Sequence, residues 1–442
     1  MAPRSSEVVP QSSLGMKPFK HRNKHPQSGE LWLEDKKLLD GAEGLWRVHD
    51  KIYDLNAFIR KHPGGPSWLQ VTKGTDITEA FESHHISTGP EELLQKFYVR
   101  DAKTKRNSPF TFEENGFYRT LKKNVREALK DIPKQPIGTS AFFTDVSCIA
   151  TFLFAVLAIT YENYLLAIIA GCFLAFTSIA SHNYIHKKDN FRMYYMNLSL
   201  MDYREWRVTH ALSHHLYTNT INDLEITAFE PIVPFLPTEK SSKTKILSCL
   251  YVPLLMASVF HLCLIFRVRG YIIDKEIRKN IKLEDFILFL LPLTMYVLGG
   301  QSLLRTLIFW NIIIVVGSFH FFVVGFTAAH HHPDIFHDGD ATRGDKIDWG
   351  IGQLDAVVDR VEITGSHWLV LTTFGDHCLH HMFPTLDHGA LDYIYPIFRK
   401  TMKEFNVNMR FSTELTLMKG MFRQLVRSEP NPNPPDLFKT LD

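Results

Sequence analysis

The chain is poor in cysteine and nearly balanced in charge. Its 442 residues include five cysteines, and no pair has the spacing of a metal knuckle or a disulfide framework. The 49 basic and 47 acidic residues give a net charge of +2, which argues against nucleic acid as a partner. Because the cysteines lack these spacings, we expect them to be reduced thiols in a cytosol-facing or lipid context.

The N-terminal sequence MAPRSSEVVPQSS lacks the apolar core of a signal peptide. Its richness in proline, serine and lysine is typical of disorder, so residues 1–28 are expected to form a disordered lead. Residues 29–103 are predicted to form a small soluble domain. Residues 104–140 form a charged connector with helical stretches, and residues 141–430 form the membrane part.

Long apolar runs fill the membrane part. Two of them are near the roughly 20 residues needed to cross a bilayer, and Tyr161–Asn163 is the predicted turn between them. If all sites lie on one membrane face, an even number of crossings must separate them, so we expect two hairpins. Basic residues flank the third run, which we place in the interface or as a re-entrant segment. Basic residues after the first hairpin predict that this side is cytosolic. The runs are Phe142–Thr160, Tyr164–Ala180, Ile246–Phe266, Phe286–Gly300 and Leu303–Thr327.

The soluble domain contains two informative stretches, YDLNAFIRKHPGG and GTDITEAFESHHIS. In the first, the Pro-Gly-Gly after His62 makes a tight turn with little side-chain bulk, where a flat group can approach the backbone. The second predicts a capped helix that ends at His84 and His85. Both stretches resemble the cytochrome b5 family. That resemblance implies haem b with His62 as one axial ligand and either His84 or His85 as the other, with His85 favoured.

Histidines recur near the apolar runs in four sets. Ionisable groups at membrane depth are costly, so four such sets indicate a shared metal site. Imidazole suits Fe, Zn, Cu or Ni. The number of histidines exceeds the ligands of one tetrahedral zinc, so we expect either two metal ions or one octahedral site with outer partners. The sets are His182 and His186; His210, His214 and His215; His330, His331 and His332; and His377, His380 and His381.

The histidine sets lack the paired Glu-x-x-His motifs of soluble di-iron bundles, which excludes that class. A haem domain in the same chain favours redox chemistry over hydrolysis. From about Ser140 to His388 the chain resembles the membrane fatty acid desaturase family. That resemblance implies two iron ions that activate dioxygen, held by the histidine boxes. The implied ligands are His182, His186, His210, His214, His215, His330, His377, His380 and His381.

Several further residues carry expectations. Asp223, Asp355 and Asp376 are candidates for holding the N–H groups of ligands. His331 and His332 are expected to be spare polar residues, and His337 and His388 to lie at the surface. In one subgroup of fused desaturases the third box often begins with Gln, whereas this chain has His377, which leaves the double-bond position open.

Together these features predict an α+β cytochrome b5-like haem domain followed by an all-α membrane desaturase-like domain with about four transmembrane helices. The expected function is an acyl desaturase that uses dioxygen and electrons from NADH-cytochrome b5 reductase. We expect it in the endoplasmic reticulum membrane, with the haem domain and histidine boxes facing the cytosol. The alternatives are a lipid hydroxylase on the same metals, and a membrane-anchored electron carrier whose desaturase domain is inactive.

Overall fold

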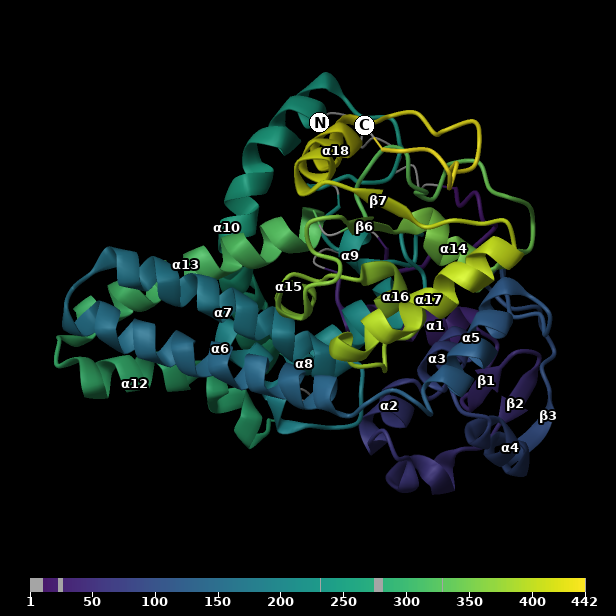
Figure 1. Cartoon of the computed structure of the whole chain (residues 1–442), viewed down its shortest axis with the longest axis horizontal. Helices are drawn as coiled ribbons and strands as arrows, with labels where there is room; N and C mark the ends of the chain where they lie inside the picture. Colours follow the sequence, from purple (N-terminus) through teal and green to yellow (C-terminus); the bar gives the residue numbers. More distant parts are fainter. Residues whose placement is uncertain (1–10, 23–26, 231, 274–280, 328, 442) are drawn as a thin grey trace.

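A computed structural model describes residues 11–22, 27–230, 232–273, 281–327 and 329–441. The N-terminal domain is a three-stranded antiparallel sheet in the order β1-β2-β3, surrounded by short helices (Figure 1). Trp46 and Phe81 lie in its apolar core. Its elements are α1 (Gly29–Leu39), β1 (Trp46–Val48), β2 (Lys51–Tyr53), η1 (Asn56–Lys61), α2 (Pro66–Val71), α3 (Thr78–His84), α4 (Gly89–Leu94), η2 (Gln95–Phe97) and β3 (Tyr98–Asp101).

The rest of the chain is mainly helical, with two short parallel strand pairs, β4-β5 and β6-β7. The expected class, an α+β domain followed by a helical membrane domain, is confirmed. The elements are β4 (Phe110–Thr111), α5 (Phe117–Ala128), α6 (Gln135–Thr160), α7 (Tyr164–Ile185), η3 (Phe191–Ser199), α8 (Tyr203–Trp206), η4 (Arg207–His214), α9 (Leu224–Thr227), α10 (Ser242–Ile273), η5 (Leu283–Phe289), α12 (Leu290–Gly299), α13 (Leu303–Thr327), β5 (Ile347–Asp348), α14 (Trp349–Ala356), β6 (Val358–Arg360), α15 (His367–Thr372), α16 (His377–Met382), α17 (His388–Glu404), β7 (Arg410–Ser412) and α18 (Glu414–Val426).

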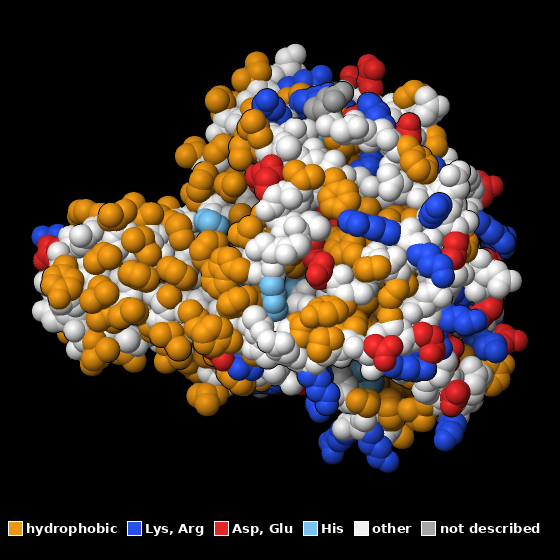
Figure 2. Space-filling view, in the orientation of Figure 1, with side chains coloured by type: hydrophobic (Ala, Val, Ile, Leu, Met, Phe, Trp, Pro, Cys, Tyr) orange, Lys and Arg blue, Asp and Glu red, His pale blue; other side chains and the backbone are white. Residues whose placement is uncertain are grey.

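Helices α6, α7, α12 and α13 form an arm that projects from the body of the molecule (Figure 1). The surface of this arm is almost entirely apolar, whereas charged side chains gather on the body (Figure 2). Among the residues that the structure describes, four helices, α6, α7, α10 and α13, are long and apolar enough to cross a membrane. The predicted turn at Tyr161–Asn163 joins α6 to α7. Such a large exposed apolar surface fits a membrane protein.

Two of the predicted apolar runs take a different form from the first hairpin. Ile246–Phe266 lies inside α10, which runs steeply across the direction of α7 and α13 in Figure 1. Phe286–Gly300 is not one continuous span, because a 3-10 turn, η5, ends at Phe289 and α12 adds only 10 residues. Asp285 at the start of η5 is buried and pairs with Arg204 and Arg267, which fixes this segment against the body.

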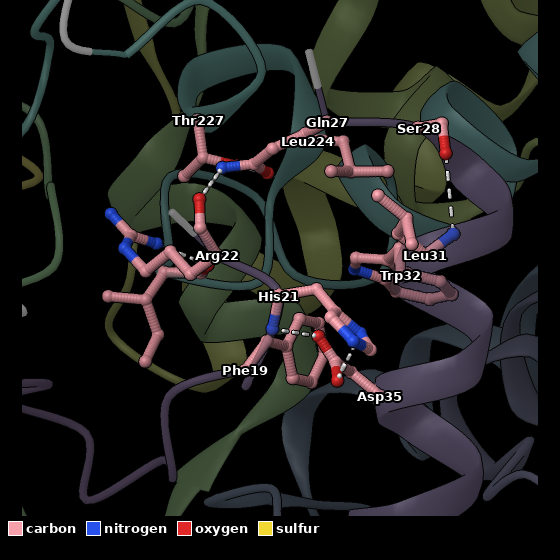
Figure 3. Close-up of a pocket in the computed structure, with 11 residues that line it drawn as sticks. Phe19, His21, Arg22, Gln27, Ser28, Leu31, Trp32, Asp35, Leu224 and Thr227 are labelled. Atoms are coloured by element: carbon pink, nitrogen blue, oxygen red, sulfur yellow. Dashed lines mark hydrogen bonds and ion pairs between the residues drawn. The ribbon is translucent and has the colours of Figure 1, made fainter. Parts of the chain in front are cut away.

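The prediction that the lead segment is disordered is corrected by the structure. Residues 1–10 and 23–26 lie outside the described residues, but residues 11–22 pack against the body. The Ser12 hydroxyl donates to Asp338 at 2.9 Å, and the Arg22 guanidinium donates to the Ile221 carbonyl at 2.8 Å. Figure 3 shows His21 and Arg22 beside a small pocket, with His21 facing Asp35 of α1. The composition of this segment does not reveal its contacts with Asp338 and Ile221, because these partners lie far away along the chain.

The predicted connector is also part of the core. Phe117, Tyr118, Leu121 and Val125 of α5 are all buried, at the spacing of one helix face. They join the same apolar cluster as Trp349 and Phe383 of the membrane domain. Helix α5 therefore packs the N-terminal domain against the helical body of the molecule.

Candidate metal centre and haem pocket

Nine buried histidines converge in the body, and they are the nine that the sequence nominated. They form two sets, and within each set the ligand atoms all lie within 4.8 Å of one another. The first set is His182, His186, His210, His215 and His380. The second set is His214, His330, His377 and His381.

The spacing of the ring nitrogens fits metal ligands better than hydrogen bonds. The Nε2 atom of His182 lies 2.9 Å from that of His186, 2.7 Å from that of His210 and 3.1 Å from that of His380. A neutral imidazole has one N–H, so these contacts cannot all be hydrogen bonds. Nitrogens bound about 2.1 Å from one metal ion, at right angles, are about 3 Å apart. The first set therefore matches the shell of a single ion.

The second set has the same geometry. The Nε2 atom of His330 lies 3.2 Å from that of His214 and 2.7 Å from that of His377. His381 completes the set, with its Nε2 atom 3.2 Å from that of His377. Four nitrogens would leave two positions open on an octahedral ion. Two ions in adjacent shells are thus the arrangement that the residues support.

The first box stands at the body end of α7. His182 is in the last turn of the helix and His186 is its C-cap residue, four positions later. Residues four apart share one face of an α-helix, so both rings enter the first set. Both residues are buried, with at most 1% of their surface exposed.

The second box lies on η4, which is a π-helix. Its backbone bonds span five residues, as in the 3.0 Å bond from the His215 N–H to the His210 carbonyl. A π-turn brings residues five apart onto one face. His210 and His215 therefore join the first set, while His214 points to the second. Sequence spacing alone did not reveal this division.

The third box, on α16, is also divided between the sets. His377 and His381 are four apart and enter the second set, while His380 enters the first. Asp359 fixes the start of the helix by accepting the backbone N–H groups of His377 and Cys378 at 2.7 and 3.1 Å.

Carboxylates and an amide orient the ligand rings from behind. The Nδ1 atom of His214 faces Asp223 at 2.9 Å, as predicted, and that of His210 faces Glu225 at 2.5 Å. Burial opposes charge on His214, but Asp223 and Glu225 raise its pKa to about 9. Glu225 and Gln353 were missed by sequence reasoning, although Glu225 stands only two residues beyond Asp223.

Gln353 supports both sets. Its side-chain oxygen lies 3.0 Å from the Nδ1 atom of His381, and its amide group donates to the carbonyl of His215 at 3.2 Å. Gln353 is 1% exposed. No local motif could have identified it, because α14 reaches the site only through the fold.

Two of the predicted orienting aspartates have other partners. Asp355 forms a bidentate pair with Arg343 at 2.7 and 2.8 Å. Asp376 faces the Tyr395 hydroxyl at 3.1 Å, and burial raises its pKa to about 7. Asp376 also has a left-handed backbone, with φ of 48°, at the entry to the third box.

The remaining histidines have structural contacts. His331 stacks on Phe235 with ring centroids 3.7 Å apart, and His332 accepts the Asp334 N–H at 3.2 Å, so both are outside the two sets as expected. The prediction that His337 and His388 lie at the surface is wrong, because both are buried. His388 lies against the first set, 4.4 Å from His380 between ring centroids.

The haem domain presents a second pair of facing imidazoles. The rings of His62 and His85 are 6.2 Å apart and nearly perpendicular, at 85°. Imidazoles bound about 2 Å on either side of one ion have ring centroids about 6 Å apart. Their Nδ1 atoms face the carbonyls of Gly65 and Phe81 at 2.9 and 3.0 Å, which leaves each Nε2 atom free to bind iron.

An apolar wall borders the first metal set. Phe374 lies 5.0 Å from His182 between ring centroids, and Trp206 lies 4.6 Å from His210. Phe321 packs against both aromatic rings, at 5.5 and 5.6 Å. These side chains exclude water from one side of the cluster and offer a hydrocarbon surface there.

Comparisons with known proteins agree with this architecture. A fatty acid desaturase family model matches residues 159–413, and a cytochrome b5-like heme/steroid binding domain model matches residues 33–103. The cytochrome b5-related protein of Drosophila melanogaster is 42% identical over 428 residues, which cover 95% of this chain and 96% of that protein. No solved structure matches.

More distant relatives are also similar along most of their length. Acyl-lipid (8-3)-desaturase B of Dictyostelium discoideum is 24% identical, over 89% of this chain and 90% of that protein. Acyl-lipid (8-3)-desaturase of Mortierella alpina is 24% identical, over 81% and 88%. The predicted fusion of a cytochrome b5 domain with a desaturase domain is confirmed.

Proposed function

Because the chain belongs to the fatty acid desaturase family and carries a cytochrome b5 domain, we propose that it introduces a double bond into a fatty acyl chain. The observation that carries this proposal is the pair of adjacent histidine sets, five and four strong, beside an apolar wall. The enzyme is an oxidoreductase, its cytochrome b5 domain binds haem and its desaturase domain binds two irons.

We assign the cofactor ligands from the geometry above. His62 and His85 would hold the haem, and the nine converging histidines would hold the irons. The irons supply the power to reduce dioxygen and to break unactivated C–H bonds. The protein supplies the orientation of the ligands and the pocket for the substrate. Glu225, Asp223 and Gln353 orient the rings, and the aromatic wall of Trp206, Phe321 and Phe374 would seat an acyl segment in a dry pocket.

The membrane arm explains how an acyl chain would reach this site. The exposed surface of the arm is apolar, as a lipid-facing surface would be (Figure 2), and the first histidine box stands at the C-terminal end of α7. We place the protein in the endoplasmic reticulum membrane with its body and haem domain in the cytosol, where NADH-cytochrome b5 reductase is the electron donor. The basic residues after α7, such as Lys187 and Lys188, support that orientation.

Expression in a yeast strain lacking desaturase activity tests the proposal. The intact chain should produce new unsaturated acyl species, and the His377→Ala variant should not. Two relatives are named acyl-lipid desaturases, so membrane lipids should be profiled together with acyl thioesters. Absence of any new unsaturated species from the intact chain would contradict the proposal.

The same experiment separates the alternatives. A hydroxylase would add one oxygen to the product, whereas a desaturase removes two hydrogens. A membrane-anchored electron carrier would give neither product and would hold no non-haem iron, which metal analysis of the purified protein detects.

A further inference from the structure

The haem domain holds a second imidazole at the end of α3, His84, next to the ligand position of His85. Its Nδ1 atom lies 3.0 Å from the carbonyl of Ala80, and its Nε2 atom is enclosed without a hydrogen-bond partner. Because His62 already faces His85, the haem pocket leaves His84 for another role.

On its other side His84 faces the metal centre. Its ring centroid is 6.5 Å from that of His186, a member of the first set, and the two planes differ by 38°. Trp68 lies 5.7 Å from His84, on the helix that follows the His62 turn. Trp68, His84 and His186 thus form a short row of rings from the haem pocket to the iron pocket.

The second histidine box holds this row in place. The guanidinium of Arg207, at the start of η4, lies 4.8 Å over the Trp68 ring. It also donates to the Ser67 hydroxyl at 2.9 Å and pairs with Asp189 at 2.8 Å. A Cβ atom at Gly65 would lie 2.7 Å from the Asp189 carboxylate, so the haem-binding turn is in close contact with the loop after the first box.

The third histidine box contacts α3, the helix that ends at His84. The Thr385 hydroxyl donates to the carbonyl of His84 at 3.4 Å. The Tyr118 hydroxyl donates to the Met382 carbonyl at 2.9 Å and lies 3.4 Å from the Glu82 carbonyl. These contacts hold α3 against α16, with Tyr118 of α5 between them. The haem domain therefore packs directly against the part of the chain that carries the third histidine box.

We propose that His84 is the electron-transfer bridge between the haem pocket and the first iron site, held in position by Trp68 and Arg207. The inference rests on the proposed function, because it assumes that haem electrons are used at the irons. It assigns His84 as a positioning residue and His85 as the axial ligand.

The redox balance is simple. Each transfer oxidises the haem iron by one electron and reduces one iron of the cluster by one electron, while the imidazole of His84 neither gains nor loses a proton. Two transfers provide two electrons. With two protons, one dioxygen and the two hydrogens removed from the acyl chain, they yield two waters. A flavoprotein reductase that oxidises NADH supplies the electrons.

Haem reoxidation in the purified full-length protein tests this bridge. The haem is reduced with dithionite under argon and mixed with aerated buffer, and its return to the ferric form is followed by absorption. His182→Ala, which disrupts the first iron site, gives the baseline rate. His84→Leu and His84→Gln are compared with the wild type. His21→Gln is the control, because His21 pairs with Asp35 at 3.0 Å, apart from the row and from the contacts of Glu82.

We expect both His84 variants to keep the bis-imidazole haem spectrum and the wild-type iron content, while their reoxidation slows by about an order of magnitude towards the baseline. His21→Gln should match the wild type. If either folded His84 variant loses that spectrum, or reoxidises at the wild-type rate, the bridge is wrong. If the wild type does not exceed the His182→Ala baseline, both the bridge and the proposed function fail.

Discussion

The Nδ1 atom of His210 lies 2.5 Å from a carboxylate oxygen of Glu225, fifteen residues further along the chain. This contact fixes the tautomer of His210, because a proton on Nδ1 leaves Nε2 free for the metal. Glu225 also lies 3.5 Å from the Nε2 atom of His214, the nitrogen that faces the second set. This carboxylate therefore lies beside one histidine of each set, and the three residues themselves form a group that could hold a metal ion.

Replacement of Glu225 should weaken iron binding without unfolding the chain. Glu225→Gln keeps the shape but removes the charge, and loss of such an outer partner typically costs about 10–100-fold in metal affinity. Iron retention during titration with a chelator measures this. Asp355→Asn is the control, since Asp355 pairs with Arg343 rather than with a ligand. Equal iron loss in both variants would refute the role of Glu225.

The docking of the haem domain depends on a buried ion pair. Glu82 of α3 is fully buried, and Lys122 of α5, which is 3% exposed at its side chain, lies 3.0 Å away. Removing one partner of an isolated buried pair costs about 3–5 kcal/mol, but Glu82 also pairs with Arg119 and His49, so we expect a smaller loss here. Lys122→Met should therefore lower the melting temperature, measured by haem absorption and tryptophan fluorescence.

Lys130→Met is the matched control for that variant. Its partner Glu127 and Lys130 itself are both exposed, so the pair contributes little, and no measurable change is expected. The double variant Glu82→Gln, Lys122→Met should recover part of the lost stability. An unchanged melting temperature in Lys122→Met would mean that the haem domain is not anchored through this pair.

The membrane arm depends on close helix contact at Gly171. A Cβ atom there would lie 2.6 Å from the Cβ atom of Val316 and 2.9 Å from the carbonyl of Ile313, both on α13. Small residues allow such approach between membrane helices. Gly171→Ala should cost about 1–3 kcal/mol by overpacking. Gly138→Ala, where no atom lies within 4 Å, should be neutral or slightly stabilising. Thermal unfolding in detergent compares the two, and equal effects would contradict this packing.

The sequence nominated the nine histidines that converge but did not group them. Sets of histidines beside apolar runs nominated all nine rings, because imidazoles are costly at that depth unless they serve a site. The division into sets depends on backbone geometry. The π-helix separates His214 from His210 and His215, and this local winding has no signature in a His-x-x-x-His-His pattern.

Long-range partners account for the other differences. The lead segment is polar, so composition predicts disorder, but Asp338 and Glu230 accept its hydrogen bonds and order residues 11–22. His388 follows the last box and looked like a surface residue, yet the Nδ1 atom of its ring faces Asn183 at 2.9 Å in the core. Sequence distance conceals such contacts, since each joins segments more than two hundred residues apart.

The central claim is that the nine histidines hold two irons in separate shells of five and four nitrogens. Non-haem iron per chain, measured with ⁵⁷Fe Mössbauer spectroscopy on the purified protein and on two variants, tests it most directly. The wild type should contain two irons in distinct environments. His182→Ala should lose the first of these signals, and His381→Ala the second. A single environment, or the same signal lost in both variants, would contradict the account.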